Sequence, residues 1–76
     1  MIRYDEHAEF QIARRGIEKA WVERVLCAPD LVEAAGRRRS CLKCLPGRRI
    51  MLRVVTPIDD PEFVITAYFD RTRPCE

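Results

Sequence analysis

The chain has 76 residues and a formal net charge of +2, with 47% of its residues apolar and 34% charged. This composition excludes a disordered chain, and no apolar run approaches the roughly 20 residues that cross a bilayer. We therefore expect one small soluble domain, residues 1–76, and the polar opening "MIRYDEH", which is unlike a secretory signal, favours the cytoplasm.

Two short helices are predicted near the start of the chain. Asp5 suits the N-cap of the first helix, and Gly16 ends it as a C′ glycine, with Ile17 in the position of a Schellman contact. The second helix is predicted from about Glu18 to Ala28, because the proline that follows disfavours further helix. Its core-facing stripe consists of Trp21, Val22, Val25 and Leu26.

The rest of the chain predicts strands joined by short turns. Residues 31–36 and 37–45 have weak strand patterns, and the strongest pattern covers residues 49–56. A final strand is expected at 63–69, followed by a loose tail at 71–76. One face of the last two strands carries Ile50, Leu52, Val54, Phe63, Ile65, Ala67 and Phe69. This order predicts an α+β domain with two N-terminal helices packed on one face of a three- to four-stranded antiparallel sheet.

Basic residues are concentrated in the middle of the sequence. Residues 34–56 carry seven basic and no acidic side chains, whereas both flanking segments are net acidic. Such a block favours an anionic partner, either an RNA backbone or an acidic protein. The candidate contacts are Arg37, Arg38, Arg39, Lys43, Arg48 and Arg49. The alternative is a solvated hairpin whose edge-strand charges oppose aggregation.

Four cysteines raise the alternatives of a disulfide framework and a zinc site. A disulfide framework is not expected, because thiols stay reduced in the cytosol. Cys41 and Cys44 have the C-x₂-C spacing of a zinc knuckle, but a tetrahedral site needs four ligands. Residues three apart in a strand also point to opposite faces. Zinc is therefore disfavoured, and no cofactor is expected.

Several segments resemble the domain-of-unknown-function 4258 family. "HAEFQIARRGI", residues 7–17, resembles the family's opening H-A-x-x-R-M-x-x-R-G-I. "WVERVLCAPDLV" is similar to the helix and nP-x-x-V boundary that follow, and "MLRVVTP" and "FVITAYF" resemble its last two strands, which end in V-T-x-Y. The resemblance runs from about Ile2 to Tyr68, with one departure: Gln11 stands where the family has its first arginine.

The resemblance implies a RelE-like or barnase-like fold of the kind found in ribonuclease toxins. The family's motif positions are matched in this chain by His7, Arg15, Gly16, Thr66 and Tyr68. The function that it implies is a toxin-like, metal-independent endoribonuclease or RNA-binding domain of a toxin–antitoxin system. If the arginine replaced by Gln11 serves catalysis in the family, activity here is weakened or lost.

The chemistry of such an enzyme assigns roles to these residues. A metal-independent ribonuclease deprotonates a ribose 2′-hydroxyl, stabilises an anionic phosphorus centre and protonates the leaving 5′-oxygen. His7 suits the acid or base, Arg15 and Arg53 suit the phosphate, and Thr66 and Tyr68 lie on a late strand that faces them. Tyr68 suits either an acid or a stacking platform.

A non-catalytic reading of the same residues stays open. A lone histidine at a helix start is commonly a surface residue, and threonine and tyrosine are ordinary strand formers. The alternative function is therefore a binding module that uses the basic hairpin to hold RNA or an acidic antitoxin-like protein.

Overall fold

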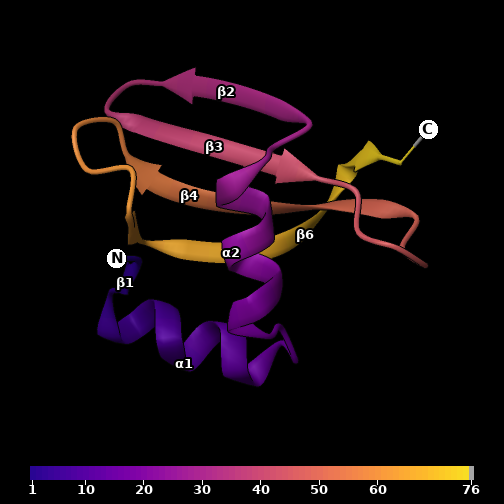
Figure 1. Ribbon diagram of the computed structural model, residues 1–76, viewed down its shortest axis with the longest axis horizontal. Coiled ribbons are helices and arrows are strands. Elements are labelled where there is room, and N and C mark those ends of the chain that lie inside the picture. The colour runs from indigo at the N-terminus through magenta and orange to yellow at the C-terminus, as the bar shows by residue number, and fades with distance from the viewer. Residues whose placement is uncertain (76) are drawn as a thin grey trace.

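The chain folds around a four-stranded antiparallel sheet (Figure 1). The computed structural model describes residues 1–75. Its elements are β1 (Arg3–Tyr4), α1 (Glu6–Arg14), α2 (Lys19–Cys27), β2 (Leu31–Ala35), β3 (Arg38–Lys43), β4 (Ile50–Pro57), β5 (Phe63–Val64) and β6 (Thr66–Pro74). The strand order is β2-β3-β4-β6, and β1 pairs in parallel with β5 in a separate two-stranded sheet. The predicted α+β class and antiparallel sheet are confirmed.

Local sequence signals define both ends of α1. The Asp5 carboxylate accepts a hydrogen bond from the backbone N–H of His7 at 3.0 Å, as an N-cap should. Gly16 has a φ of 69°, and the N–H of Ile17 donates to the carbonyl of Ile12 at 2.8 Å. This is the six-to-one bond of a Schellman motif, with Ile12 and Ile17 both in the core. The predicted helix stop is confirmed.

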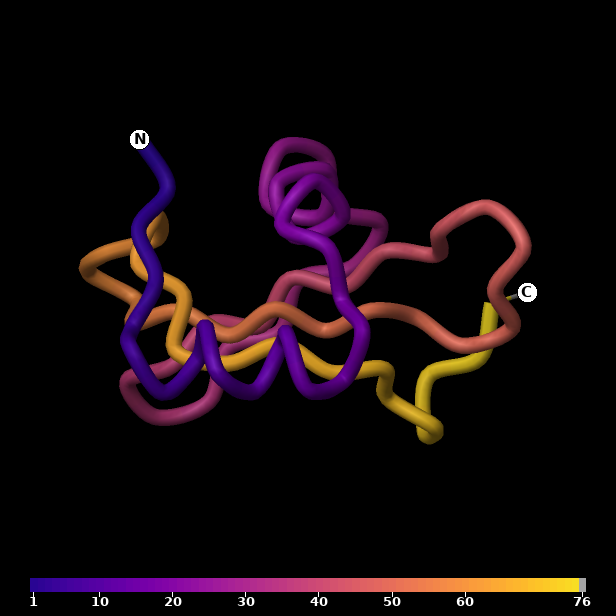
Figure 2. Tube along the Cα trace, turned by 90° about the horizontal axis from the view of Figure 1, so that it is seen from below, coloured from indigo at the N-terminus to yellow at the C-terminus, as the bar shows by residue number. Residues whose placement is uncertain are grey.

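The two helices occupy different positions relative to the sheet. Figure 2 looks along the sheet from the α1 side and shows α2 standing on one side of the strands, with α1 level with them. Accordingly, α2 contacts β3 and β4, whereas α1 contacts β6. The prediction that both helices cover one face is therefore wrong. Only Ala8 and Ile12 of α1 are buried, and so narrow an apolar stripe fits a sheet edge rather than a face.

One face of the sheet is left without a helix over it. We call this side, opposite α2, the open face, because alternation along the strands turns it away from the helix-side core. It carries Glu33, Arg38, Ser40, Arg53, Val55 and Tyr68, which line a shallow hollow of about 230 Å³. No helix among residues 1–75 is long and apolar enough to cross a bilayer.

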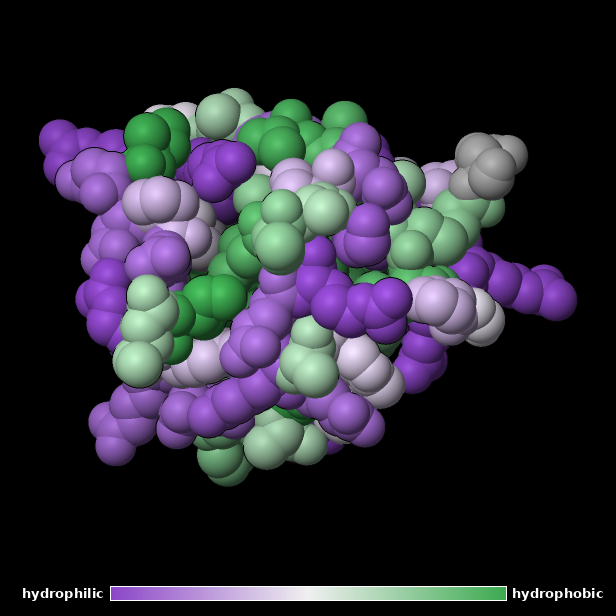
Figure 3. Space-filling model, viewed as in Figure 1, coloured by the Kyte–Doolittle hydropathy of each residue, from purple (hydrophilic) through white to green (hydrophobic). Residues whose placement is uncertain are grey.

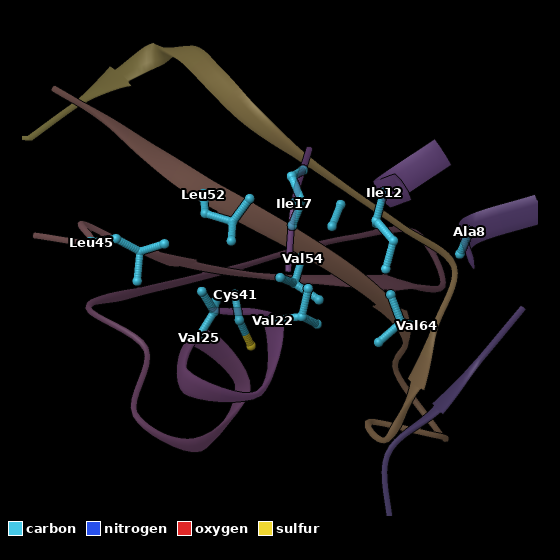
Figure 4. Close-up of a cluster of buried hydrophobic side chains, with 11 residues drawn as sticks. Ala8, Ile12, Ile17, Val22, Val25, Cys41, Leu45, Leu52, Val54 and Val64 are labelled. Carbon is cyan, nitrogen blue, oxygen red and sulfur yellow. The ribbon is translucent and has the colours of Figure 1, made fainter. Parts of the chain in front are cut away.

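The core lies between the α2-side face of the sheet and both helices (Figure 4). Its buried members are Ala8, Ile12, Ile17, Val22, Val25, Cys41, Leu45, Leu52, Val54, Val64 and Ala67. Trp21 and Leu26 of the predicted α2 stripe are partly buried against this cluster. The helices and strands therefore share one apolar cluster.

The predicted last strand is divided into two. Val64 and Ala67 are both in the core although they are three residues apart, so a regular strand does not join them. Ile65 is the irregular residue between β5 and β6, and its N–H donates to the carbonyl of Val55 at 2.8 Å. The predicted single face with Phe63 and Ala67 is therefore wrong. The break lets β5 pair with β1 while β6 pairs with β4.

The C-terminal segment is held in place. Cys44 and Cys75 form a disulfide with a Cα–Cα distance of 5.5 Å, and the N–H of Cys75 donates to the carbonyl of Arg49 at 2.7 Å. In Figure 2 the yellow segment first dips to the side away from α2 and then returns to end beside the connection between β3 and β4. Two expectations are therefore wrong, the absence of a disulfide and the loose tail, since β6 continues to Pro74. Residue 76 lies outside the described residues.

The other two cysteines have separate surroundings. Cys41 is buried in the core, and burial raises the pKa of its thiol. Cys27 is exposed at the end of α2. The two cysteines of the C-x₂-C motif thus do not share a site, because Cys44 is bonded to Cys75.

Removing the Cys44–Cys75 bond should destabilise the fold. The cross-link closes a loop across a sequence separation of 31 residues. Its loss in Cys44→Ser is expected to lower the free energy of unfolding by about 2–4 kcal/mol, measured by urea denaturation. Cys27→Ser is the matched control and should unfold as the wild type does. Equal stability of Cys44→Ser and Cys27→Ser would contradict a stabilising role for this disulfide.

Candidate functional site

Arg15 joins the end of α1 to the start of β6. Its Nη1 donates to the carbonyl of Ala67 at 2.9 Å and lies 3.4 Å from Oγ1 of Thr66. The guanidinium carbon also lies 5.9 Å from the centroid of the Tyr68 ring. These contacts arise because α1 runs beside β6 and the Schellman turn ends the helix at this point. We call Arg15, Thr66 and Tyr68 the seam cluster.

His7 lies on the same row of α1 as Arg15. His7, Gln11 and Arg15 are spaced four residues apart, which places them one above another on a helix. Nε2 of the Gln11 amide is 3.3 Å from Nε2 of the exposed His7 ring, and it donates when that ring nitrogen carries no proton. The ring is therefore engaged by Gln11, two helical turns from the backbone of Arg15.

Gln11 has an unsatisfied atom at this seam. Its Oε1 is buried and has no hydrogen-bond partner among residues 1–75, while its Nε2 faces His7. Gln11 also stands where the family's H-A-x-x-R-M-x-x-R-G-I motif has its first arginine, so the one departure from that motif contacts His7. Sequence reasoning identified the position, but not its contact with His7.

Arg53 is held by two carboxylates on the open face. Its Nε donates to Oδ2 of Asp70 at 2.8 Å, and its Nη2 donates to Oε1 of Glu33 at 3.1 Å. The side chain is only 13% exposed. Burial acts to lower the pKa of Arg53, but the hydrogen bonds to Asp70 and Glu33 raise it overall. Arg53 faces Tyr68 in the register, yet its charge is already paired.

The carboxylate partners are ionised for identifiable reasons. The hydroxyl and backbone N–H of Thr72 donate to Asp70 at 2.6 and 2.9 Å and, with Arg53, lower the pKa of Asp70 to about 2. Hydrogen bonds from Arg73, followed by those from Arg53, lower the pKa of Glu33. We call these five residues the carboxylate network. It joins β2, β4 and β6 across the open face.

This network was missed in the sequence. Glu33 and Arg73 are 40 residues apart, and only the strand order brings them to 2.6 Å. The pair Asp70 and Thr72 did carry a local signal, since an aspartate commonly accepts hydrogen bonds from the residue two positions on.

The basic run does not form one continuous surface. Arg38 lines the open-face hollow, whereas Arg39 lines a separate hollow beside α2. Nζ of Lys43 donates to the carbonyl of Ala28 at 2.8 Å, so part of its donor capacity is used within the fold.

The ends of the run lie at opposite ends of β3. Arg37 is in the turn between β2 and β3, whereas Arg48 and Arg49 lie in the connection between β3 and β4. The Arg48 guanidinium packs between rings, 5.2 Å from the centroid of Trp21 and 4.8 Å from that of Phe69. The alternative of edge-strand charges is wrong, because the edge strand is β2 and the basic residues follow it.

These features identify the structural class of the molecule. The molecule is a small α+β domain whose open sheet face is bordered by an arginine–tyrosine seam and crossed by an ion-pair network. The family described as Domain of unknown function (DUF4258) matches residues 4–69, and the chain belongs to this family. Comparison with curated proteins gave no match, and neither did comparison with solved structures.

The stability of the fold should depend on pH through the carboxylate network. The pKa of Asp70 falls from roughly 3.9 in the unfolded chain to about 2 in the fold. Ionised Asp70 therefore contributes its full stabilisation at pH values above roughly 3.9. The free energy of unfolding should therefore decrease as the pH is lowered from about 4 to about 2. Urea denaturation across this pH range measures the effect.

Asp70→Asn tests the assignment of that acid dependence. It leaves buried Arg53 with one carboxylate and should lower the free energy of unfolding at pH 7 by about 1–3 kcal/mol. It should also flatten the decrease at low pH. Asp59→Asn, at an exposed aspartate in the loop after β4, is the control. An unchanged acid dependence in Asp70→Asn would contradict the network.

Proposed function

We propose that this chain is a toxin-like, metal-independent endoribonuclease domain whose RNA lies along the seam between α1 and β6. The observation that carries the proposal is the seam cluster, where the exposed Arg15 guanidinium lies against Thr66 and Tyr68 on a strand that borders the open face. The proposal includes a RelE-like arrangement of the domain. It also includes an acidic antitoxin-like protein as regulator and a cytoplasmic location, where the Cys44–Cys75 pair would be kept reduced.

Arg15, Tyr68 and His7 each suit a part of RNA cleavage. Arg15 retains free donors beyond those used on β6, and a guanidinium binds a phosphate through two parallel hydrogen bonds. Tyr68 keeps 37% of its surface exposed and offers a ring on which a base can stack. His7 supplies the imidazole for proton transfer with the 2′-hydroxyl or the leaving oxygen.

The geometry shifts the phosphate role from Arg53 to Arg15. Arg53 is nearly buried and its charge is balanced by Asp70 and Glu33, so binding a phosphate there would break existing ion pairs. Arg15 is exposed and has no carboxylate partner among residues 1–75. In this proposal Arg53 stabilises the strands under the RNA rather than touching it.

Cleavage of single-stranded RNA in a chelating buffer tests the proposal. Arg15→Ala should reduce the rate by about 10²–10³-fold, because a donor to the developing charge is lost. His7→Ala should reduce it by about 10²–10⁴-fold, because proton transfer is lost. Gel analysis of end-labelled RNA gives both rates.

Arg14→Ala is the matched control for Arg15→Ala. Arg14 is the neighbouring exposed arginine of α1, and the contacts to β6 are those of Arg15. Its variant should cleave at nearly the wild-type rate. Equal losses in the two variants, or no cleavage by the wild type at high protein concentration, would overturn the enzymatic proposal.

A second candidate is a non-catalytic RNA-binding module at the same seam. Two features favour it. The charge of Arg53 is balanced by Asp70 and Glu33, and Gln11 stands where the family has an arginine, so two cations that catalysis would use are not free to act. This module predicts RNA binding that weakens steeply with salt, falls in Arg15→Ala and is unchanged in His7→Ala. Fluorescence anisotropy with labelled RNA separates it from the enzyme.

A further inference from the structure

Strand β2 is an edge with little protection. It ends the strand order and pairs only with β3, whereas α1 lies along the opposite edge strand β6. Exposed edges are commonly blocked by lysine, proline or outward charges. The five residues of β2 contain one charge, Glu33, and its carboxylate is bound by Arg53 and Arg73. The edge is therefore available for pairing.

Apolar side chains are concentrated on this strand. Leu31 and Val32 are 37% and 45% exposed, although they are large aliphatic residues inside a sheet. Figure 3 shows hydrophobic residues in green along the upper margin of the molecule, at the position that β2 has in Figure 1. A partner that extended the sheet at β2 would cover both side chains.

The sequence of β2 is complementary to itself in antiparallel orientation. With Glu33 at the centre, Leu31 of one copy faces Ala35 of the other, and Val32 faces Ala34. Each large side chain thus meets a small one. The two central carboxylates of Glu33 are adjacent, but each is bound by two arginines of its own chain.

The ends of the strand are complementary in charge. The same register brings Asp30, just before β2, close to Arg37, just after it. Asp30 is ionised, because the backbone N–H of Cys44 donates to it at 3.0 Å and, with Lys43, lowers its pKa. Arg37 forms no ion pair within residues 1–75. An antiparallel copy therefore gives Arg37 a carboxylate partner, Asp30, which also pairs with Lys43 of its own chain at 3.6 Å.

We propose that a second copy of this chain binds along β2, so that the two four-stranded sheets become one eight-stranded sheet with twofold symmetry. The contact is made by a strand of five residues, so the interface is small and the dimer is weak and concentration-dependent. The open faces of the two copies become one continuous surface. This inference does not depend on ribonuclease activity.

Sedimentation velocity across a wide range of protein concentrations tests the dimer. The full chain carrying Cys27→Ser is used, since this removes the exposed thiol and its oxidation between copies. The expected result is a shift from 8.9 kDa toward twice that mass as concentration rises. Val32→Lys should raise the dissociation constant by at least about tenfold, because it adds like charges at the edge. A monomer at every concentration would overturn the proposal.

Phe10→Lys is the matched control, because Phe10 is 62% exposed on α1, which lies along the opposite edge strand β6. It should dimerise as the parent does, and circular dichroism shows whether each variant is folded. Should Val32→Lys fail to fold, Arg37→Glu replaces it, since this turn residue lies outside the strands and its variant should also weaken the dimer. A dimer that persists unchanged in the folded β2-edge variant overturns the proposal.

Discussion

The position of α1 depends on the burial of one narrow stripe of apolar side chains. Ala8 and Ile12 are the buried residues of the helix, and they pack into the core that α2 and the strands share. A wider stripe would have favoured packing over a sheet face. Because α1 lies at the edge instead, it protects β6 and brings Arg15 onto that strand. The same packing leaves one face of the sheet open.

Two arginines near this face have opposite surroundings. Arg53 is nearly buried between carboxylates and stabilises contacts among β2, β4 and β6. Arg15 is exposed, and its contacts within residues 1–75 are with neutral groups, a carbonyl, a hydroxyl and an aromatic ring. A free cation next to a partly exposed ring is what an RNA backbone and base require. A charge already paired in the fold is a poor phosphate ligand.

Short-range signals in the sequence predicted much of the fold. Asp5, Gly16 and Ile17 fixed the ends of α1, since caps depend on residues a few positions apart. The strength of β4 followed from its alternation. The seam residues Arg15, Thr66 and Tyr68 came from a family resemblance rather than from local pattern.

What escaped prediction depends on long-range register. The irregular residue Ile65, the disulfide between Cys44 and Cys75 and the network around Arg53 are set by how strands align. Alternation in the sequence predicts the two faces of a strand but does not reveal where an irregular residue interrupts the alternation. For the same reason, the run from Arg37 to Arg49 appeared as one surface in the sequence and is divided between faces and ends in the structure.

The proposed function depends on contact between RNA and the seam of α1 with β6. Titration of the isotopically labelled chain with single-stranded RNA in a chelating buffer, followed by nuclear magnetic resonance, tests it most directly. The largest shifts are expected at Arg15 and at residues 66–68. Shifts confined to the connection between β3 and β4, or no shifts at high RNA concentration, would contradict it.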